Sequence, residues 1–163
     1  MISDLLILVT PENTETFIRL FLAMSLGAIL GLERVFAKKS AGIRTYALVS
    51  MGSALFILSS EYVVKQYLYT GIQVNPLQVA SNIVVGVGFL GAGIIIFKDS
   101  KLTGLTTAAG LWVVSAIGMA VGFGYYLAAF FTTIFTLAIF TLLWYVEEKL
   151  FIAYKGIDVP EER

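Results

Sequence analysis

The chain has 163 residues, of which 58% are hydrophobic and only 13% are charged. A soluble domain carries roughly 25% charged residues, so this composition predicts an integral membrane protein. Basic and acidic residues balance at 11 each, and the absence of cysteine and histidine excludes thiol chemistry, imidazole bases and the usual zinc sites. The first nine residues lack a basic start and a small-residue cleavage site, so we expect no signal peptide.

Five apolar runs are long enough to cross a hydrocarbon core of about 30 Å. They cover approximately residues 17–32, 45–64, 79–97, 105–123 and 125–146. The predicted fold class is therefore all-α, a polytopic membrane helix bundle of about five transmembrane helices. Residues 1–16 form an N-terminal segment that lies at the interface or packs as a short helix, residues 17–146 form the transmembrane domain, and residues 147–163 form a short cytoplasmic tail.

Lysines and arginines follow the first, third and fifth spans, which places them on one side of the membrane. These segments hold four, two and three basic residues, whereas the other side holds Lys65, with Arg19 at the rim. Short cytoplasmic loops are enriched in basic residues, so we predict an outside N-terminus and a cytoplasmic C-terminus. We expect the long side chain of Arg19 to reach the interface.

The densest polar cluster surrounds the loop after the first span. Gly27, Gly31 and Arg34 share one helical face, and Glu33 is positioned to pair with Arg44 across the loop. One interpretation is interfacial anchoring with one structural ion pair. The other is a ligand or partner site, for example for a phosphate-bearing group, because arginine binds such groups through two parallel hydrogen bonds.

The third span contains Asn82 and four closely spaced glycines, Gly86, Gly88, Gly91 and Gly93. Their G-x-G-x-x-G spacing is not a dinucleotide fingerprint, because a preceding strand and an acidic residue about 20 positions later are missing. Each glycine inside a helix costs about 1 kcal/mol relative to alanine, so four of them indicate close approach by other backbones. We expect this span at the centre of the bundle, with its glycines serving packing alone or lining a cavity with Asn82.

An internal repeat with an offset of 62 residues relates the first two spans to the third and fourth. Seven of 24 aligned positions are identical, including Gly31 with Gly93 and Ser53 with Ser115. Both copies consist of a helix, a basic loop and a helix in the same orientation, the pattern of a parallel repeat about an axis along the membrane normal. Glu33, Arg34 and Arg44 align with the uncharged Ile95, Ile96 and Thr106, so we expect these three charges to serve function rather than the fold.

Two stripes of small residues could support self-association, most simply as a dimer. One contains Gly27 and Gly31, and the other contains Gly118 and Gly122. Small residues four apart let helix backbones approach closely in a membrane. Packing within the chain is the alternative explanation for both stripes.

Four motifs follow one another in the chain: G-A-I-L-G-L-E-R, A-G-I-R-T-Y-A-L-V, G-V-G-F-L-G-A-G-I-I and G-L-T-T-A-A-G-L-W. In these motifs, over about residues 20–125, the chain resembles the MgtC/SapB family of membrane proteins. The resemblance implies a multi-pass protein of the cell inner membrane, associated with magnesium limitation and, in some pathogens, with virulence inside host cells. It also implies links to the rotary ATP synthase and to ion or phosphate homeostasis.

The motif positions and the polar pattern together give the candidate residues. Those predicted to bind a ligand or partner are Glu33, Arg34, Arg44, Thr45, Asn82, Thr106 and Thr107. Those predicted to pack helices are Gly27, Gly31, Gly86, Gly88, Gly91, Gly93, Gly118 and Gly122. The chain departs from the resemblance at Gln78 and Asn82, where the family often has a basic residue and a glutamine. Many members also continue into a soluble C-terminal domain, which we do not expect here.

Three classes of function remain to be weighed. Magnesium keeps its waters and prefers carboxylates, yet Glu33, Glu61 and Asp99 all lie near span edges. We therefore rank a regulator acting through a membrane protein partner above a transporter or channel for magnesium or another small solute. An enzyme ranks last, because the spans lack an acid–base pair. We expect contacts with the lipid bilayer and a second copy, but no nucleic acid, catalytic residue or cofactor.

Overall fold

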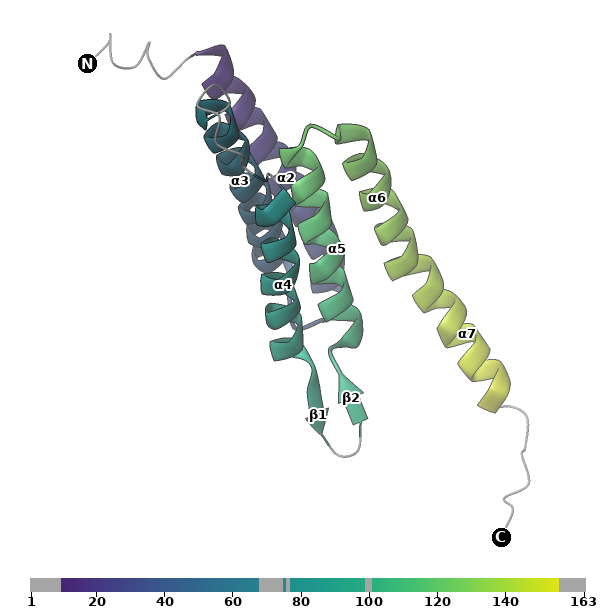
Figure 1. Cartoon of the computed structure of the whole chain (residues 1–163). Helices are drawn as coiled ribbons and strands as arrows, with labels where there is room; N and C mark the ends of the chain where they lie inside the picture. The colour runs from purple at the N-terminus through teal and green to yellow at the C-terminus, as the bar shows by residue number, and fades with distance from the viewer. Residues whose placement is uncertain (1–9, 68–74, 76, 99–100, 156–163) are drawn as a thin grey trace.

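The computed structural model describes residues 10–67, 75, 77–98 and 101–155, which form a bundle of long helices with one short hairpin (Figure 1). The elements are α2 (Pro11–Phe36), α3 (Ile43–Tyr67), α4 (Leu77–Ile94), β1 (Ile96–Lys98), β2 (Lys101–Thr103), α5 (Leu105–Gly122), α6 (Tyr126–Ala138), the π-helical turn η1 (Ile139–Leu143) and α7 (Trp144–Lys155). Five helical segments of the described chain are long and apolar enough to span a membrane. The prediction of an all-α membrane bundle with five spans is confirmed.

The first span begins at Pro11, six residues before the predicted boundary. The Thr10 side chain accepts a hydrogen bond from the backbone N–H of Asn13 at 3.2 Å, which caps the helix. Proline at the first helical position needs no N–H partner, and Glu12 complements the positive end of the helix dipole. These polar start signals lie outside the apolar run, so hydropathy alone placed the boundary too late. Residues 1–9 lie outside the described part.

The third span ends earlier than predicted, because residues 96–98 leave the helix. β1 pairs with β2 in antiparallel register, with Ile96 opposite Thr103. Gly104 then adopts a left-handed conformation with φ of 89°, and its position against the Ile94 carbonyl leaves no room for a side chain. The hairpin therefore turns the chain directly from α4 into α5.

The central helix of the bundle is α5, not α4 as predicted. α5 contacts α2, α3, α4 and α6, and a side chain at Gly118 would collide with the Ser50 carbonyl of α3. α4 lies at the edge, where only Val87 and Gly91 are buried. Glycines show that another helix can approach this backbone closely, but they do not show whether that helix belongs to the same chain. For this reason the glycine pattern misplaced α4.

A contact between α3 and α5 fits the internal repeat. The hydroxyl oxygens of Ser53 and Ser115 lie 2.8 Å apart, and these residues are separated by 62 positions, the offset of the repeat. A two-fold axis brings equivalent residues together where it passes between two helices. The hydrogen bond is therefore where an axis relating α2–α3 to α4–α5 would place it.

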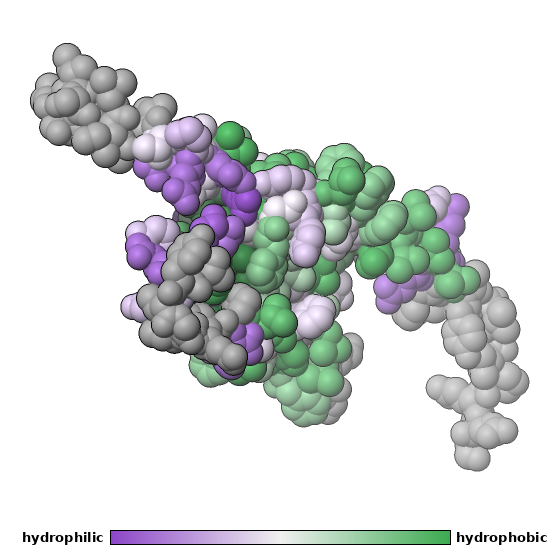
Figure 2. Space-filling model, turned by 45° about the horizontal axis from the view of Figure 1, so that its top comes forward, coloured by the Kyte–Doolittle hydropathy of each residue, from purple (hydrophilic) through white to green (hydrophobic). Residues whose placement is uncertain are grey.

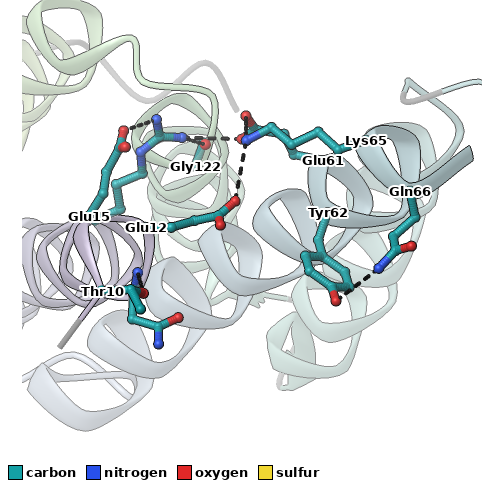
Figure 3. A network of polar contacts seen from close by, with 10 residues as sticks. Thr10, Glu12, Glu15, Glu61, Tyr62, Lys65, Gln66 and Gly122 are labelled. Atoms are coloured by element: carbon teal, nitrogen blue, oxygen red, sulfur yellow. Dashed lines mark hydrogen bonds and ion pairs between the residues drawn. The ribbon is translucent and has the colours of Figure 1, made fainter. Parts of the chain in front are cut away.

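A network of charges joins α2, α3 and α5 at the end of the bundle where α2 begins (Figure 3). The Arg19 guanidinium donates to the Gly122 carbonyl oxygen at 2.8 Å and pairs with Glu15 and Glu61. Lys65 pairs with Glu61 at 3.2 Å. Arg19 therefore binds a carbonyl at the end of α5, where the helix leaves its last carbonyls unsatisfied. It does not simply reach into the interface, as the sequence suggested.

Apolar side chains cover the flanks of the helices, as expected for surfaces in contact with lipid (Figure 2). Phe89 on α4 and Leu127 on α6 are 80% and 75% exposed. In the view of Figure 2, hydrophilic residues gather around the start of α2 and on α7, with the green flanks between them. This distribution matches a bundle that crosses the bilayer with its polar groups at the two ends.

Candidate functional site at the basic end of the bundle

Arg34 is a buried cation in the last turn of α2. Its side chain is 2% exposed, and its guanidinium pairs with the carboxylate of the neighbouring Glu33. The guanidinium carbon also lies 3.5 Å from the centre of the Phe140 ring in η1. A planar guanidinium can donate to a carboxylate at its edge while its face stacks on an aromatic ring. The two contacts together offset part of the cost of removing the charge from water.

Gly110 of α5 leaves the space that the side chains of Tyr46 and Phe140 occupy. A side chain at Gly110 would collide with the Tyr46 hydroxyl and would lie 2.8 Å from the Phe140 ring. Tyr46 is fully buried, and its hydroxyl donates to the backbone carbonyl of Thr107 at 3.4 Å. Tyr46 and Phe140 therefore both lie against the bare backbone of α5 at Gly110, and Arg34 stacks on the Phe140 ring.

The chain after Arg34 turns sharply and exposes two lysines. Lys38 adopts a left-handed conformation with φ of 53°, and the Lys39 N–H donates to the Arg34 carbonyl at 2.9 Å. A left-handed residue just after a helix lets the following N–H groups satisfy its last carbonyls. Both lysine side chains are exposed at this end of the bundle.

A groove of about 1220 Å³ opens at this end, between the end of α2, the start of α5 and the rod formed by η1 and α7. In Figure 1, this rod leans away from the other helices toward its C-terminal end. The residues that line the groove are Glu33, Arg34, Phe36, Ala37, Lys38, Lys39, Thr106, Ile139, Phe140, Thr141, Leu143, Trp144, Tyr145, Glu147 and Glu148.

The structure brings together only some of the predicted binding residues. Glu33, Arg34 and Thr106 line the groove, and Thr107 lies buried beside them. Arg44 and Thr45 are exposed at the start of α3.

The expected pairing of Glu33 with Arg44 is wrong. Glu33 instead pairs with Arg34. The buried guanidinium is shielded from water and needs a counter-charge, whereas the exposed guanidinium of Arg44 is solvated by water. Within the described part of the chain, Arg44 forms no ion pair.

Asn82 lies far from this groove. It is exposed in the second turn of α4, and at 1.5 Å per residue it lies about 18 Å along the axis from the end at Ile94. The structure therefore does not bring Asn82 together with Glu33 and Arg34, the other predicted binding residues. Helical periodicity places Asn82, Gly86 and Gly93 on one face, but it cannot show which way that face points.

The two stripes of small residues are both filled within the chain. A side chain at Gly27 would lie 2.6 Å from the Tyr46 carbonyl oxygen, and one at Gly31 would lie 2.6 Å from the Ile43 Cα. One at Gly122 would lie 2.8 Å from the Ile57 Cβ. These glycines let α2 and α5 pack directly on α3, so neither stripe is free to form a dimer.

Tyr46, Gly110 and Phe140 belong to the site although they were not among the predicted residues. Tyr46 follows Arg44 and Thr45 in the motif A-G-I-R-T-Y, so its neighbourhood gave a signal. Phe140 stands in a span rich in phenylalanine and leucine, where no pattern distinguishes it. Among the described residues, no group of three or more carboxylates could hold a metal ion.

Comparison with known proteins supports one family. Residues 20–149 match the MgtC family. The chain is 41% identical over 128 residues to the "Putative magnesium transporter YhiD" of Escherichia coli K12, covering 78% of this chain and 60% of that protein. It is 42% identical over 126 residues to "Protein MgtC" of Salmonella typhimurium LT2, covering 77% and 51%. An uncharacterized protein of Haemophilus influenzae is 34% identical over 133 residues, covering 80% and 56%.

The chain spans only about half to three-fifths of the length of these relatives. The similarity therefore concerns the membrane bundle that the structure describes. No solved structure matches the chain.

Proposed function

The chain belongs to the MgtC family of membrane proteins, and from this premise we propose that it regulates ion homeostasis under magnesium limitation through contacts with a membrane protein partner. The observation that carries the proposal is an open face on α4. This face comprises Asn82, Gly86, Phe89 and Gly93, which lie on one side of the helix and are all exposed.

The open α4 face has the shape of a helix-docking surface. A side chain added at Gly86 or Gly93 would meet no atom of this chain within 4 Å. Contact with lipid alone does not require glycine, and each such residue costs about 1 kcal/mol relative to alanine inside a helix. Glycines at a membrane helix interface let a second backbone approach closely. The exposed ring of Phe89 lies between the two glycines, where it can pack against that second helix.

The matched test places leucine at two open glycine positions on α4 and, as a control, at one open glycine position on α3. Gly52 on α3 is also surrounded by open space, so Gly52→Leu controls for added bulk on an unfilled surface. In a host where the wild-type protein supports growth at low magnesium, we expect Gly86→Leu with Gly93→Leu to insert normally and lose that support. Gly52→Leu should retain it. Wild-type growth from the double variant would refute the proposal.

A photo-crosslinking residue at Phe89 identifies the occupant. A crosslinked product of twice the protein's mass would show that a second copy docks on the open α4 face, and a product that contains another polypeptide would show a different membrane protein. The position suits the experiment, because Phe89 is 80% exposed and its replacement leaves the core intact. Lipid adducts alone would contradict a protein partner.

A transporter or channel for magnesium or another small solute is the second candidate, favoured by the name of the Escherichia coli relative. Magnesium prefers oxygen ligands in near-octahedral geometry, and the described residues offer no carboxylate group of three. Liposomes containing only this protein separate the two functions. Magnesium uptake above that of protein-free liposomes would establish transport, whereas a regulator that needs its partner would give none.

A further inference from the structure

The groove at the basic end lies where the first span ends, the level at which we expect phospholipid headgroups. α2 ends beside it, and the chain becomes polar at Lys38 and Lys39. Two of its lining residues are Trp144 and Tyr145, which are 58% and 51% exposed. Such amphipathic aromatic side chains concentrate at the membrane–water interface. This position and these aromatic side chains are those expected of a groove that borders both lipid and water.

The inner wall of the groove is apolar and comes from an uncommon element. Ile139, Phe140 and Leu143 line it from η1, a single π-helical turn between α6 and α7. Such turns are rare and occur frequently at functional sites. The volume of about 1220 Å³ exceeds the usual range of roughly 300–1,000 Å³ for small-molecule pockets. It can accommodate a headgroup together with the first part of an acyl chain.

The charges of the groove are separated onto opposite walls. Lys38 and Lys39 follow α2, whereas Glu147 and Glu148 stand on α7, and all four side chains are exposed. Glu33 and Arg34 neutralise each other. The remaining lining charges therefore form a positive wall and a negative wall of equal magnitude. A ligand that satisfies both walls must carry a negative and a positive group on one short headgroup.

We propose that the groove binds a phospholipid whose headgroup joins a phosphate to a primary amine, as in phosphatidylethanolamine. The lysines bind the phosphate, and the ammonium group donates hydrogen bonds to the two glutamates. The glycerol and the upper acyl chain lie against Phe140 and its apolar neighbours. A phosphatidylglycerol headgroup would leave the glutamates without a cation, and a choline headgroup carries no N–H donor. This inference does not depend on the open α4 face.

The two tryptophans of the chain supply the probe. Trp144 lines the groove, whereas Trp112 on α5 is not part of it. Trp112→Phe leaves Trp144 as the only fluorescent tryptophan. The variant is reconstituted in three bilayers of mixed phospholipids. In each, a different minor component carries bromine near the top of its acyl chain: phosphatidylethanolamine, phosphatidylglycerol or phosphatidylcholine. Brominated lipid quenches tryptophan at short range, so the loss of fluorescence measures which lipid occupies the groove.

We expect brominated phosphatidylethanolamine to be enriched roughly fivefold at Trp144 over its bulk fraction. A few exposed ion pairs acting together are strong enough for a preference of this size. Lys38→Gln with Lys39→Gln, or Glu147→Gln with Glu148→Gln, should reduce quenching to that of the other two lipids. Trp144→Phe, which leaves only Trp112, should show no preference. Retained helical circular dichroism identifies folded variants. Equal quenching by all three lipids, or preference for phosphatidylglycerol, would overturn the proposal.

Discussion

Arg34 shows how one buried charge can organise the end of a membrane bundle. Its guanidinium is held at the edge by Glu33 and at the face by Phe140. Arg34 thereby connects α2 to the distant fifth span. Arg44, ten residues later, is exposed to solvent. Two arginines that look alike in the sequence therefore have different physical roles.

This difference predicts unequal effects on stability. Glu33→Gln leaves the Arg34 charge buried without a counter-charge, so we expect a loss of roughly 3 kcal/mol, the low end for breaking a buried pair because Glu33 is partly exposed. Arg44→Lys keeps an exposed charge and should change stability by less than about 0.5 kcal/mol. Reversible unfolding in mixed micelles measures both. Equal stability of the two variants would contradict the buried pair.

The charged cluster around the first loop could be predicted from the sequence, because charges stand out against apolar spans. Its contacts could not. Phe140 lies 106 residues beyond Arg34 and has the same local surroundings as many other aromatic residues of its span. The aligned repeat showed that Glu33 and Arg34 are particular to one copy, but only the folded chain shows that Glu33 chooses Arg34 rather than Arg44.

At the scale of the element, hydropathy located all five spans, while their neighbours depended on packing. α4 and α5 both carry several glycines, yet α5 is the central helix and α4 lies at the edge. The difference lies in what each glycine meets. Gly118 touches the backbone of α3, whereas Gly88 faces open space. Spacing along one helix cannot reveal this, because it contains no information about the other helix.

Alanine at these two glycines should therefore have opposite effects. Gly118→Ala places a methyl group against the Ser50 carbonyl, which must push α3 and α5 apart and lengthen the Ser53–Ser115 hydrogen bond. Overpacking of this kind costs typically 1–3 kcal/mol. Gly88→Ala meets no neighbour and should stabilise the helix by up to about 1 kcal/mol. Thermal unfolding followed by circular dichroism tests the pair, and a destabilised Gly88→Ala would contradict the peripheral position of α4.

At the scale of the whole molecule, the two ends of the bundle have distinct constructions. At one end, the network of Arg19, Glu61 and Lys65 ties α2, α3 and α5 together. The other end opens into a groove, because the rod of η1 and α7 leans away (Figure 1). The groove therefore gives a small ligand access to the bundle from the side of the basic loops.

The orientation of the bundle in the membrane decides which side the groove faces, and we predict that it faces the cytoplasm. The chain contains no cysteine, so single cysteines report position without background. Lys39 follows α2 at the groove end, and Lys65 lies near the far end of α3. The 25 residues of α3 extend about 37 Å, which separates the two positions by the full bilayer.

An impermeant thiol reagent applied to intact cells should label Lys65→Cys, and it should label Lys39→Cys only after the membrane is opened. Both lysines are exposed, and Lys65 loses only exposed ion pairs with Glu61 and Glu12, which contribute little to stability. Neither change should therefore disturb the fold. Labelling of Lys39→Cys alone in intact cells would show that the orientation is the reverse of the predicted one and that the groove lies on the outer face. The lysines and glutamates of the groove would then meet the outer leaflet, and partners would have to approach from outside.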